Sequence, residues 1–319
     1  MTSTMPDTPV ALPAELRTNL DRAVAQVNSV VLGKANQVNL AFVSLLAGGH
    51  LLIEDLPGVG KTTLAHALAA TLDLSFQRIQ FTSDLLPSDI IGVSIFERDH
   101  NRFEFHPGPL FAQLVLADEI NRATPKTQSA LLEAMAEQQV TVDGRSHALP
   151  APFFVVATQN PLDLAGTYPL PDSQLDRFLL RISLDYPSRE AERELLTSAN
   201  RQQIIAKLAP CMSAAEIQTL REHVGAVVTS PALIDYVQGL ISITRAHAEI
   251  RIGLSPRAGL ALLMAARSHA LVAGRGYCLP EDVQAVFVHV AAHRLTLSGA
   301  GTRDRLQLAR ALLNEVPVR

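Results

Sequence analysis

A glycine-rich loop that ends in lysine and threonine is the clearest chemical feature of this 319-residue sequence. Such loops bind phosphates, because glycines let backbone N–H groups converge on the oxygens and a following helix adds its positive dipole end. Lys61 is expected to reach the β- and γ-phosphates, and Thr62 to ligate Mg²⁺. The strict pattern has glycine where this chain has Asp55, and an accidental glycine turn is the alternative. We predict an ATP site at Pro57, Gly58, Val59, Gly60, Lys61, Thr62 and Thr63.

Two adjacent carboxylates, Asp118 and Glu119, follow the apolar run 115–117. Ligand sites of α/β folds lie at the carboxyl ends of strands. We expect Asp118 to hold Mg²⁺, directly or through water, and Glu119 to orient and deprotonate the attacking water. Alone, such an acidic pair is more often a helix cap. The phosphate-binding loop upstream favours the catalytic interpretation.

Three further polar residues lie where a nucleotide could meet them. Asn160 follows an apolar run, so it either hydrogen-bonds the γ-phosphate or the attacking water, or starts a turn with Pro161. Arg177 either pairs with Asp176 or serves as an arginine finger toward the γ-phosphate of a neighbouring subunit. Ser255-Pro256-Arg257 either only starts a helix, with Ser255 as N-cap and Pro256 in the first turn, or places Arg257 toward an anion such as a phosphate, since a first-turn arginine lies against the helix dipole.

The elements that must position these residues alternate between strands and helices. Five short apolar runs have the composition of buried parallel strands: 50–53, 77–81, 114–117, 153–157 and 178–184. Helical spacing at 61–72 and 125–136 separates some of them, so we predict a parallel sheet with helices on both faces. Two segments, 93–105 and 140–149, alternate apolar and polar residues around turn residues and are predicted as β-hairpins.

Beyond Pro187 the strand signals fade and helical spacing recurs. It is found at 190–198, 215–224, 231–247, 256–273 and 280–295. At about 100–200 residues per domain, the length also favours two domains. We predict an α/β nucleotide-binding core at 1–187, with an N-terminal helix and the hairpin inserts, and a helical domain at 188–319.

Composition argues against several classes of protein. A net charge of −4 and a pI of about 6.2 give no global basic field for nucleic acid or anionic lipid. Two cysteines are too few for a disulfide framework or a zinc site. Residues 1–13 lack the apolar core of a signal peptide, and the most apolar stretch, 40–53, is too short to span a bilayer. We expect a cytoplasmic protein without a membrane span that binds no nucleic acid.

Taken in order, the motifs resemble those of the MoxR family of AAA+ ATPases, from about residue 31 to residue 294. They are Gly-Val-Gly-Lys-Thr at 58–62, Asp-Glu-Ile-Asn-Arg at 118–122, Thr-Gln-Asn-Pro at 158–161, Gly-Thr-Tyr-Pro-Leu-Pro at 166–171, Leu-Asp-Arg-Phe at 175–178 and Ser-Pro-Arg at 255–257. The resemblance implies an αβα P-loop core with a parallel sheet and a C-terminal all-helical lid. It also implies a homo-oligomeric ring, usually a hexamer, that uses ATP and Mg²⁺.

The resemblance also assigns roles to single residues. It makes Asn160 sensor 1, Arg177 the finger that acts in trans, and Arg257 sensor 2. The two predicted hairpins match an insert in helix 2 and a hairpin before sensor 1. Relatives commonly have Glu-Ala where this chain has Asp172-Ser173, a mild difference near the finger. The implied biology is chaperone-like remodelling of a protein client, with a partner that bears a von Willebrand factor A domain.

Three functions fit this set of motifs. The favoured one is ATP-driven remodelling or activation of a protein client. A magnesium-chelatase-like ATPase subunit has a similar core and similar inserts. The third is a nucleotide-locked scaffold without turnover. Because such a scaffold would typically have lost a catalytic residue, the presence of all five argues against it: Lys61, Asp118, Glu119, Asn160 and Arg177.

Overall fold

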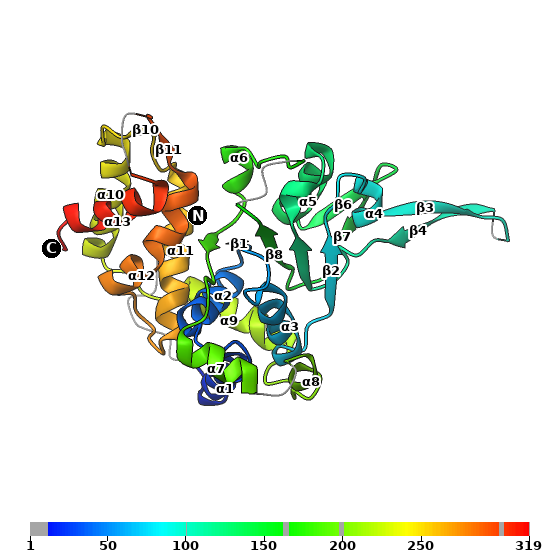
Figure 1. Cartoon of the computed structure of the whole chain (residues 1–319), viewed down its shortest axis with the longest axis horizontal. Coiled ribbons are helices and arrows are strands. Elements are labelled where there is room, and N and C mark those ends of the chain that lie inside the picture. The colour runs from blue at the N-terminus through cyan, green and yellow to red at the C-terminus, as the bar shows by residue number, and fades with distance from the viewer. Residues whose placement is uncertain (1–11, 100, 162–165, 198–200, 300–302, 319) are drawn as a thin grey trace.

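The computed structural model describes residues 12–99, 101–161, 166–197, 201–299 and 303–318. Its centre is a parallel sheet with the strand order β2-β5-β8-β1-β9 (Figure 1). The strands are β1 (Leu51–Glu54), β2 (Phe76–Gln80), β5 (Leu114–Asp118), β8 (Phe154–Gln159) and β9 (Leu180–Ile182). Each of the five apolar runs predicted as strands therefore forms one strand of this sheet.

The central strands are apolar throughout because both faces of the sheet are covered. Leu114 and Leu116 of β5 belong to one apolar core, whereas Val115 and Ala117 belong to another on the opposite face. Helices α1 (Ala14–Val30), α2 (Ala35–Leu46) and α3 (Lys61–Thr71) contribute to the first core, and α4 (Pro87–Ile91) and α5 (Pro125–Glu137) to the second. Continuous apolar runs are typical of such doubly covered strands. The predicted αβα arrangement is confirmed.

The C-terminal part is mainly helical, as predicted. Its elements are α7 (Arg189–Thr197), α8 (Arg201–Ile205), α9 (Ala214–Ala226), α10 (Pro231–Ala246), α11 (Pro256–Val272), α12 (Pro280–Ala291), η2 (Ala292–Arg294) and α13 (Arg305–Glu315). Helices α10 to α13 lie at the end of the molecule next to β9, while α8 packs near α3 (Figure 1). The apolar core of the α1–α3 face continues into α11 and α12. The boundary between residues 187 and 188 stays a prediction.

One detail of the predicted lid is wrong, because it is not all-helical. A two-stranded antiparallel sheet joins β10 (Ile250–Ile252) to β11 (Thr296–Leu297). These strands have three and two residues, too few for an alternating pattern to stand out in the sequence. Their pairing also joins segments more than forty residues apart, which local patterns do not reveal.

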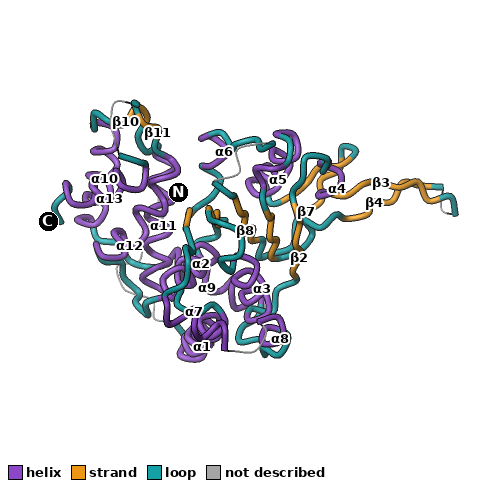
Figure 2. Tube along the Cα trace, viewed as in Figure 1, coloured by secondary structure: helices purple, strands orange, loops and turns teal. Residues whose placement is uncertain are grey.

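Both predicted hairpins are present. They are β3 (Gly92–Glu97) with β4 (Arg102–Pro107), and β6 (Gln139–Val142) with β7 (Arg145–Ala148). The β3–β4 hairpin projects from the body of the molecule, at the end opposite the lid helices (Figure 2). Its predicted turn residue His100 lies outside the described residues. Phe105 of this hairpin stacks on His147 of the other, with ring centroids 4.0 Å apart.

Two short helices complete the core, η1 (Ile120–Arg122) after β5 and α6 (Asp172–Leu175) before β9. Within the described ranges, no helix is both long enough and apolar enough to cross a membrane.

Candidate active site

The glycine-rich loop runs from the end of β1 to the first turn of α3, as predicted. Gly58 and Gly60 have φ angles of 85° and 104°, a region that glycine enters without the steric cost of a side chain. A Cβ at either position would meet no heavy atom within 4 Å among the described residues. Backbone conformation therefore requires glycine here, and the space in front of the loop is open.

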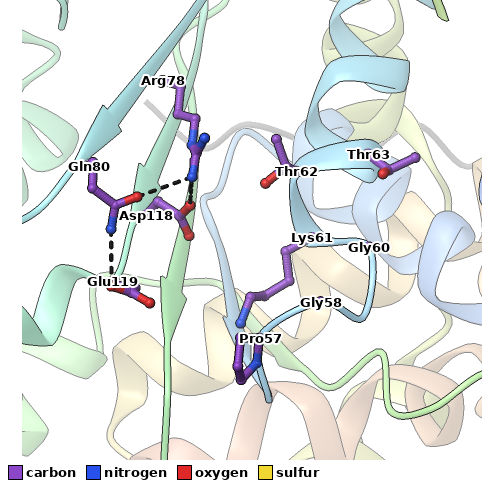
Figure 3. A pocket seen from close by; sticks show the side chains of 10 residues that line it. All are labelled: Pro57, Gly58, Gly60, Lys61, Thr62, Thr63, Arg78, Gln80, Asp118 and Glu119. Atoms are coloured by element: carbon purple, nitrogen blue, oxygen red, sulfur yellow. Dashed lines mark hydrogen bonds and ion pairs between the residues drawn. The ribbon is translucent and has the colours of Figure 1, made fainter. Parts of the chain in front are cut away.

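The loop faces the ends of two strands across a cavity of about 330 Å³, here called the P-loop cavity (Figure 3). Its lining combines the loop with residues of β2 and the acidic pair: Pro57, Gly58, Gly60, Lys61, Thr62, Thr63, Arg78, Gln80, Asp118 and Glu119. Val59, predicted with the loop, instead packs against the apolar core of the α1–α3 face. The structure thus brings two motifs that are far apart in the sequence to one cavity.

Lys61 is held close to the loop. Its ammonium donates to the backbone carbonyls of Asp55 and Leu56, with Nζ–O distances of 2.8 and 3.0 Å. Burial lowers the pKa of Lys61, and the nearby carboxylates, Asp118 first, oppose that shift. The ammonium is therefore a cation bound to weak neutral acceptors, at the place where the sequence predicts phosphate.

Asp55, the departure from the strict loop pattern, is a structural anchor. Its carboxylate accepts hydrogen bonds from the backbone N–H groups of Leu184 and Asp185, at 2.5 and 2.7 Å. It also accepts from the N–H of Leu56 at 2.8 Å. These bonds fasten the start of the loop to the segment that follows β9. Glycine could not make them, which gives a physical reason for a carboxylate here.

Asp118 is the last residue of β5, Glu119 follows it, and hydrogen bonds to Thr158 hold both. Asp118 is 7% exposed, and its Oδ1 accepts from the Thr158 hydroxyl at 2.6 Å. The same hydroxyl accepts from the N–H of Glu119 at 2.8 Å. Glu119 has φ 56° and ψ 51°, a left-handed conformation that costs energy for a residue with a side chain and that clusters at functional sites. Although Glu119 precedes η1, its side chain makes no cap hydrogen bond to the described residues, which disfavours the helix-cap alternative.

Sequence reasoning missed two residues of this site, Arg78 and Gln80. Both come from β2, which lies beside β5 in the sheet. Arg78 donates to Oδ2 of Asp118 through Nη2 at 2.7 Å, and Gln80 donates to Oε2 of Glu119 at 3.0 Å. Arg122 also approaches this Oε2, with Nε at 3.1 Å. The i, i+2 spacing of Arg78 and Gln80 indicates that both side chains lie on one face of a strand. It predicts a place in the site only when the strand is known to lie beside β5.

Asn160 directly follows β8, the strand between β5 and β1. Its backbone carbonyl accepts from the Asn121 side chain at 3.4 Å. Among the described residues, it is not part of the lining of the P-loop cavity. The structure therefore places it near the predicted site without bringing it to the cavity wall.

Arg177 and Arg257 lie in a second depression of about 390 Å³, here called the arginine groove, where the core meets the lid. Asp176, Arg177, Arg257 and Arg294 contribute its charged groups. Arg177 and Arg257 are both exposed. The Asp176 carboxylate binds Arg294, with an Nε–Oδ1 distance of 2.6 Å, and not Arg177, which was one of the two alternatives for that arginine. The two predicted arginines thus lie together, outside the P-loop cavity of their own chain.

The cavity has a donor set that fits Mg²⁺. The Thr62 hydroxyl and the Asp118 carboxylate both line it, and oxygen ligands of this kind suit a hard divalent cation. Both belong to residues predicted as metal ligands from the sequence.

Comparison with known proteins agrees with this geometry. Residues 50–180 match the ATPase family associated with various cellular activities (AAA), and residues 242–315 match the AAA lid domain. The chain is 43% identical to the uncharacterized protein YeaC of Bacillus subtilis, over 96% of both chains. It is 41% identical to the Chaperone MoxR1 of Mycobacterium tuberculosis, over 92% of this chain and 80% of the relative.

More distant relatives and a solved structure agree with these matches. The protein MoxR of Paracoccus denitrificans is 34% identical, over 92% of this chain and 93% of its own. A crystal structure of a proposed ATPase from Cytophaga hutchinsonii superposes with a TM-score of 0.86 at 36% identity, over 95% of this chain and 96% of that one. The chain belongs to the MoxR family of AAA+ ATPases.

Proposed function

We propose that this protein binds ATP in the P-loop cavity and hydrolyses it there. The observation that carries the proposal is the convergence of Lys61, Thr62, Asp118 and Glu119 on one cavity. Lys61 would neutralise the β- and γ-phosphates, and Thr62 and Asp118 would hold Mg²⁺. Bound Mg²⁺ supplies further neutralisation of the phosphates. Glu119 would orient the attacking water and accept its proton, and Asn160 would act as the polar sensor beside it.

The remaining catalytic cations would come from a neighbouring subunit. Arg177 and Arg257 are exposed and lie together in the arginine groove, outside the P-loop cavity of their own chain. In a ring, such a groove can face the nucleotide of the next subunit. This arrangement supports a homo-oligomeric ring, as AAA+ proteins typically form, and we propose a hexamer. Arg177 would then be the arginine finger and Arg257 sensor 2.

The biological role that follows is remodelling or activation of a protein client in the cytoplasm. One relative bears the name chaperone, which supports this choice. A partner with a von Willebrand factor A domain fits the same role. The rival candidate, a magnesium-chelatase-like ATPase subunit, would instead be recovered with the other chelatase subunits.

Two variants test the hydrolysis proposal. Lys61→Ala should abolish ATP binding in calorimetry, because it removes the loop's own cation. Glu119→Gln should bind ATP normally and slow turnover by about 10²–10⁴-fold, because the amide keeps the shape and cannot accept the proton. Turnover of Glu119→Gln near the wild-type rate would reduce Glu119 to a structural role. The same variant, loaded with ATP, should retain the client in a pull-down.

A further inference from the structure

Arg78 already binds the carboxylate that the proposed function assigns to Mg²⁺. Its Nη2 and Nε lie 2.7 and 3.2 Å from Oδ2 of Asp118. The other carboxylate oxygen, Oδ1, accepts from the Thr158 hydroxyl at 2.6 Å. Both oxygens of Asp118 therefore have a donor within the chain. A cation that enters at Asp118 must share Oδ2 with the guanidinium or displace it.

Of the two partners, Arg78 is the one that can move. Its side chain is 48% exposed, whereas that of Asp118 is 10% exposed and fixed by Thr158. Figure 3 shows the Arg78 guanidinium and the Asp118 carboxylate pointing toward each other on the cavity wall opposite Thr62. The same guanidinium already has a second acceptor, Oε1 of Gln80, at 3.1 Å. Displacement would leave the guanidinium inside the cavity that Lys61 lines.

We propose that Arg78 and Mg²⁺ compete for Oδ2 of Asp118, so that Arg78 sets how strongly nucleotide binding depends on the metal. This inference rests on the proposed function, because it takes the P-loop cavity as the nucleotide site. While Arg78 holds Asp118, it neutralises a carboxylate that would otherwise repel a triphosphate. When the metal takes Asp118, the metal neutralises that carboxylate in place of the guanidinium.

If Arg78 and Mg²⁺ compete for Asp118, removing Arg78 should change how much Mg²⁺ strengthens nucleotide binding. The relevant quantity is the ratio of nucleotide dissociation constants measured in EDTA and in saturating Mg²⁺. Without Arg78, Asp118 is no longer neutralised, so binding in EDTA weakens more than binding in Mg²⁺. Couplings between two ligands are usually about 5–150-fold, and we expect removal of Arg78 to raise this ratio by about tenfold. A residue that only supports the fold would weaken both affinities together and leave the ratio unchanged.

The experiment titrates the full-length protein with a fluorescent, non-hydrolysable ATP analogue in both buffers. Arg78→Gln should raise the ratio about tenfold, and Arg78→Lys, which keeps the charge, should raise it less. Arg122→Gln is the matched control, because Arg122 is similarly exposed, at 46%, and approaches Glu119 instead of Asp118. Its ratio should equal that of the wild type. Melting temperatures check that all three variants are folded.

Two results would overturn the competition. An unchanged ratio for Arg78→Gln would show that the guanidinium and the metal do not share Oδ2. A lower ratio would show that Arg78 prepares Asp118 for the metal. If the wild type itself fails to bind the analogue in Mg²⁺, the proposed function is wrong and the inference is wrong with it. That result is distinct from the other two, in which the wild type binds and only the variant comparison fails.

Discussion

The P-loop cavity and the arginine groove both present cations, but they hold them differently. In the cavity, Lys61 donates to backbone carbonyls and Arg78 pairs with Asp118, while Arg122, which is not part of the described lining, pairs with Glu119. In the groove, Arg177 and Arg257 are exposed. A cavity whose lining arginine is already paired has little positive charge to spare for a triphosphate transition state. The difference suggests that each region is incomplete alone, and that a neighbour's groove supplies what the cavity lacks.

The largest expected effect concerns Arg177. An arginine finger accelerates phosphoryl transfer by about 10³–10⁵-fold, or roughly 4–7 kcal/mol of the barrier. Arg177→Ala should therefore nearly eliminate turnover while the subunit still binds ATP. Steady-state turnover and nucleotide titration measure the two quantities. The proposed reason is that the side chain acts on the next subunit, so its own P-loop cavity is untouched.

Mixing experiments separate this explanation from a role within one chain. An Arg177→Ala subunit keeps its own Glu119, and a Glu119→Gln subunit keeps its own Arg177. Mixed rings should regain activity wherever an intact finger meets an intact base. If mixed rings are shown to form and activity does not return, the arginine groove of one subunit does not complete the P-loop cavity of the next.

A second arginine of the same groove provides a contrast in stability. Arg294 has a side chain that is 5% exposed, pairs with Asp176 and donates to the backbone carbonyl of Phe178 at 2.6 Å. Burial lowers its pKa, and the hydrogen bond that Arg294 donates to the Asp176 carboxylate opposes that shift. Arg294→Ala would leave the Asp176 carboxylate, whose side chain is 28% exposed, without its partner, and a hydrogen bond to a charged group is worth about 1.5–3 kcal/mol.

Denaturant unfolding measures this contrast. Arg294→Ala should lower the free energy of unfolding by about 1.5–3 kcal/mol, and Arg177→Ala should leave it almost unchanged because that side chain is exposed. Equal losses for the two variants would show that exposure does not separate their roles, and Arg177 would then be a structural residue too.

The sequence predicts those parts of the fold and of the site whose signal lies within one short segment of the chain. The five core strands are buried on both faces, so each reads as a continuous apolar run, and all five were predicted. The glycine loop and the acidic pair are contiguous motifs and were also found. Strands β10 and β11 were missed because they are short and pair across a long stretch of chain.

The site residues that the sequence does not predict are brought to the site by the tertiary arrangement of the strands. Arg78 and Gln80 reach the acidic pair only because β2 lies beside β5, and the sequence does not specify that order. The grouping of Arg177 with Arg257 depends in the same way on how the lid packs against the core. Resemblance predicted their roles but gave no position relative to the P-loop of their own chain.

The smallest expected effect concerns Arg257, the second exposed arginine of the groove. As sensor 2 it would donate a charge-assisted hydrogen bond to a phosphate, worth about 1.5–3 kcal/mol, so Arg257→Ala should slow turnover by about 10–100-fold. It should also weaken nucleotide-dependent assembly, measured by light scattering with and without ATP. Its stability without nucleotide should not fall, because an exposed arginine in the first turn of a helix contributes little to folding.

The stability of Arg257→Ala without nucleotide distinguishes a phosphate-sensing role of Arg257 from a purely structural one. Ser255 accepts from the N–H of Ala258 at 3.1 Å, so the cap of α11 does not depend on the arginine. Arg257→Lys serves as the matched variant, since it keeps the charge and loses the planar fork that binds phosphate. We expect it to assemble better than Arg257→Ala and still hydrolyse more slowly than the wild type. A marked loss of thermal stability in Arg257→Ala would instead mean that the side chain holds the lid helix in place, and the groove would then contribute a single functional arginine.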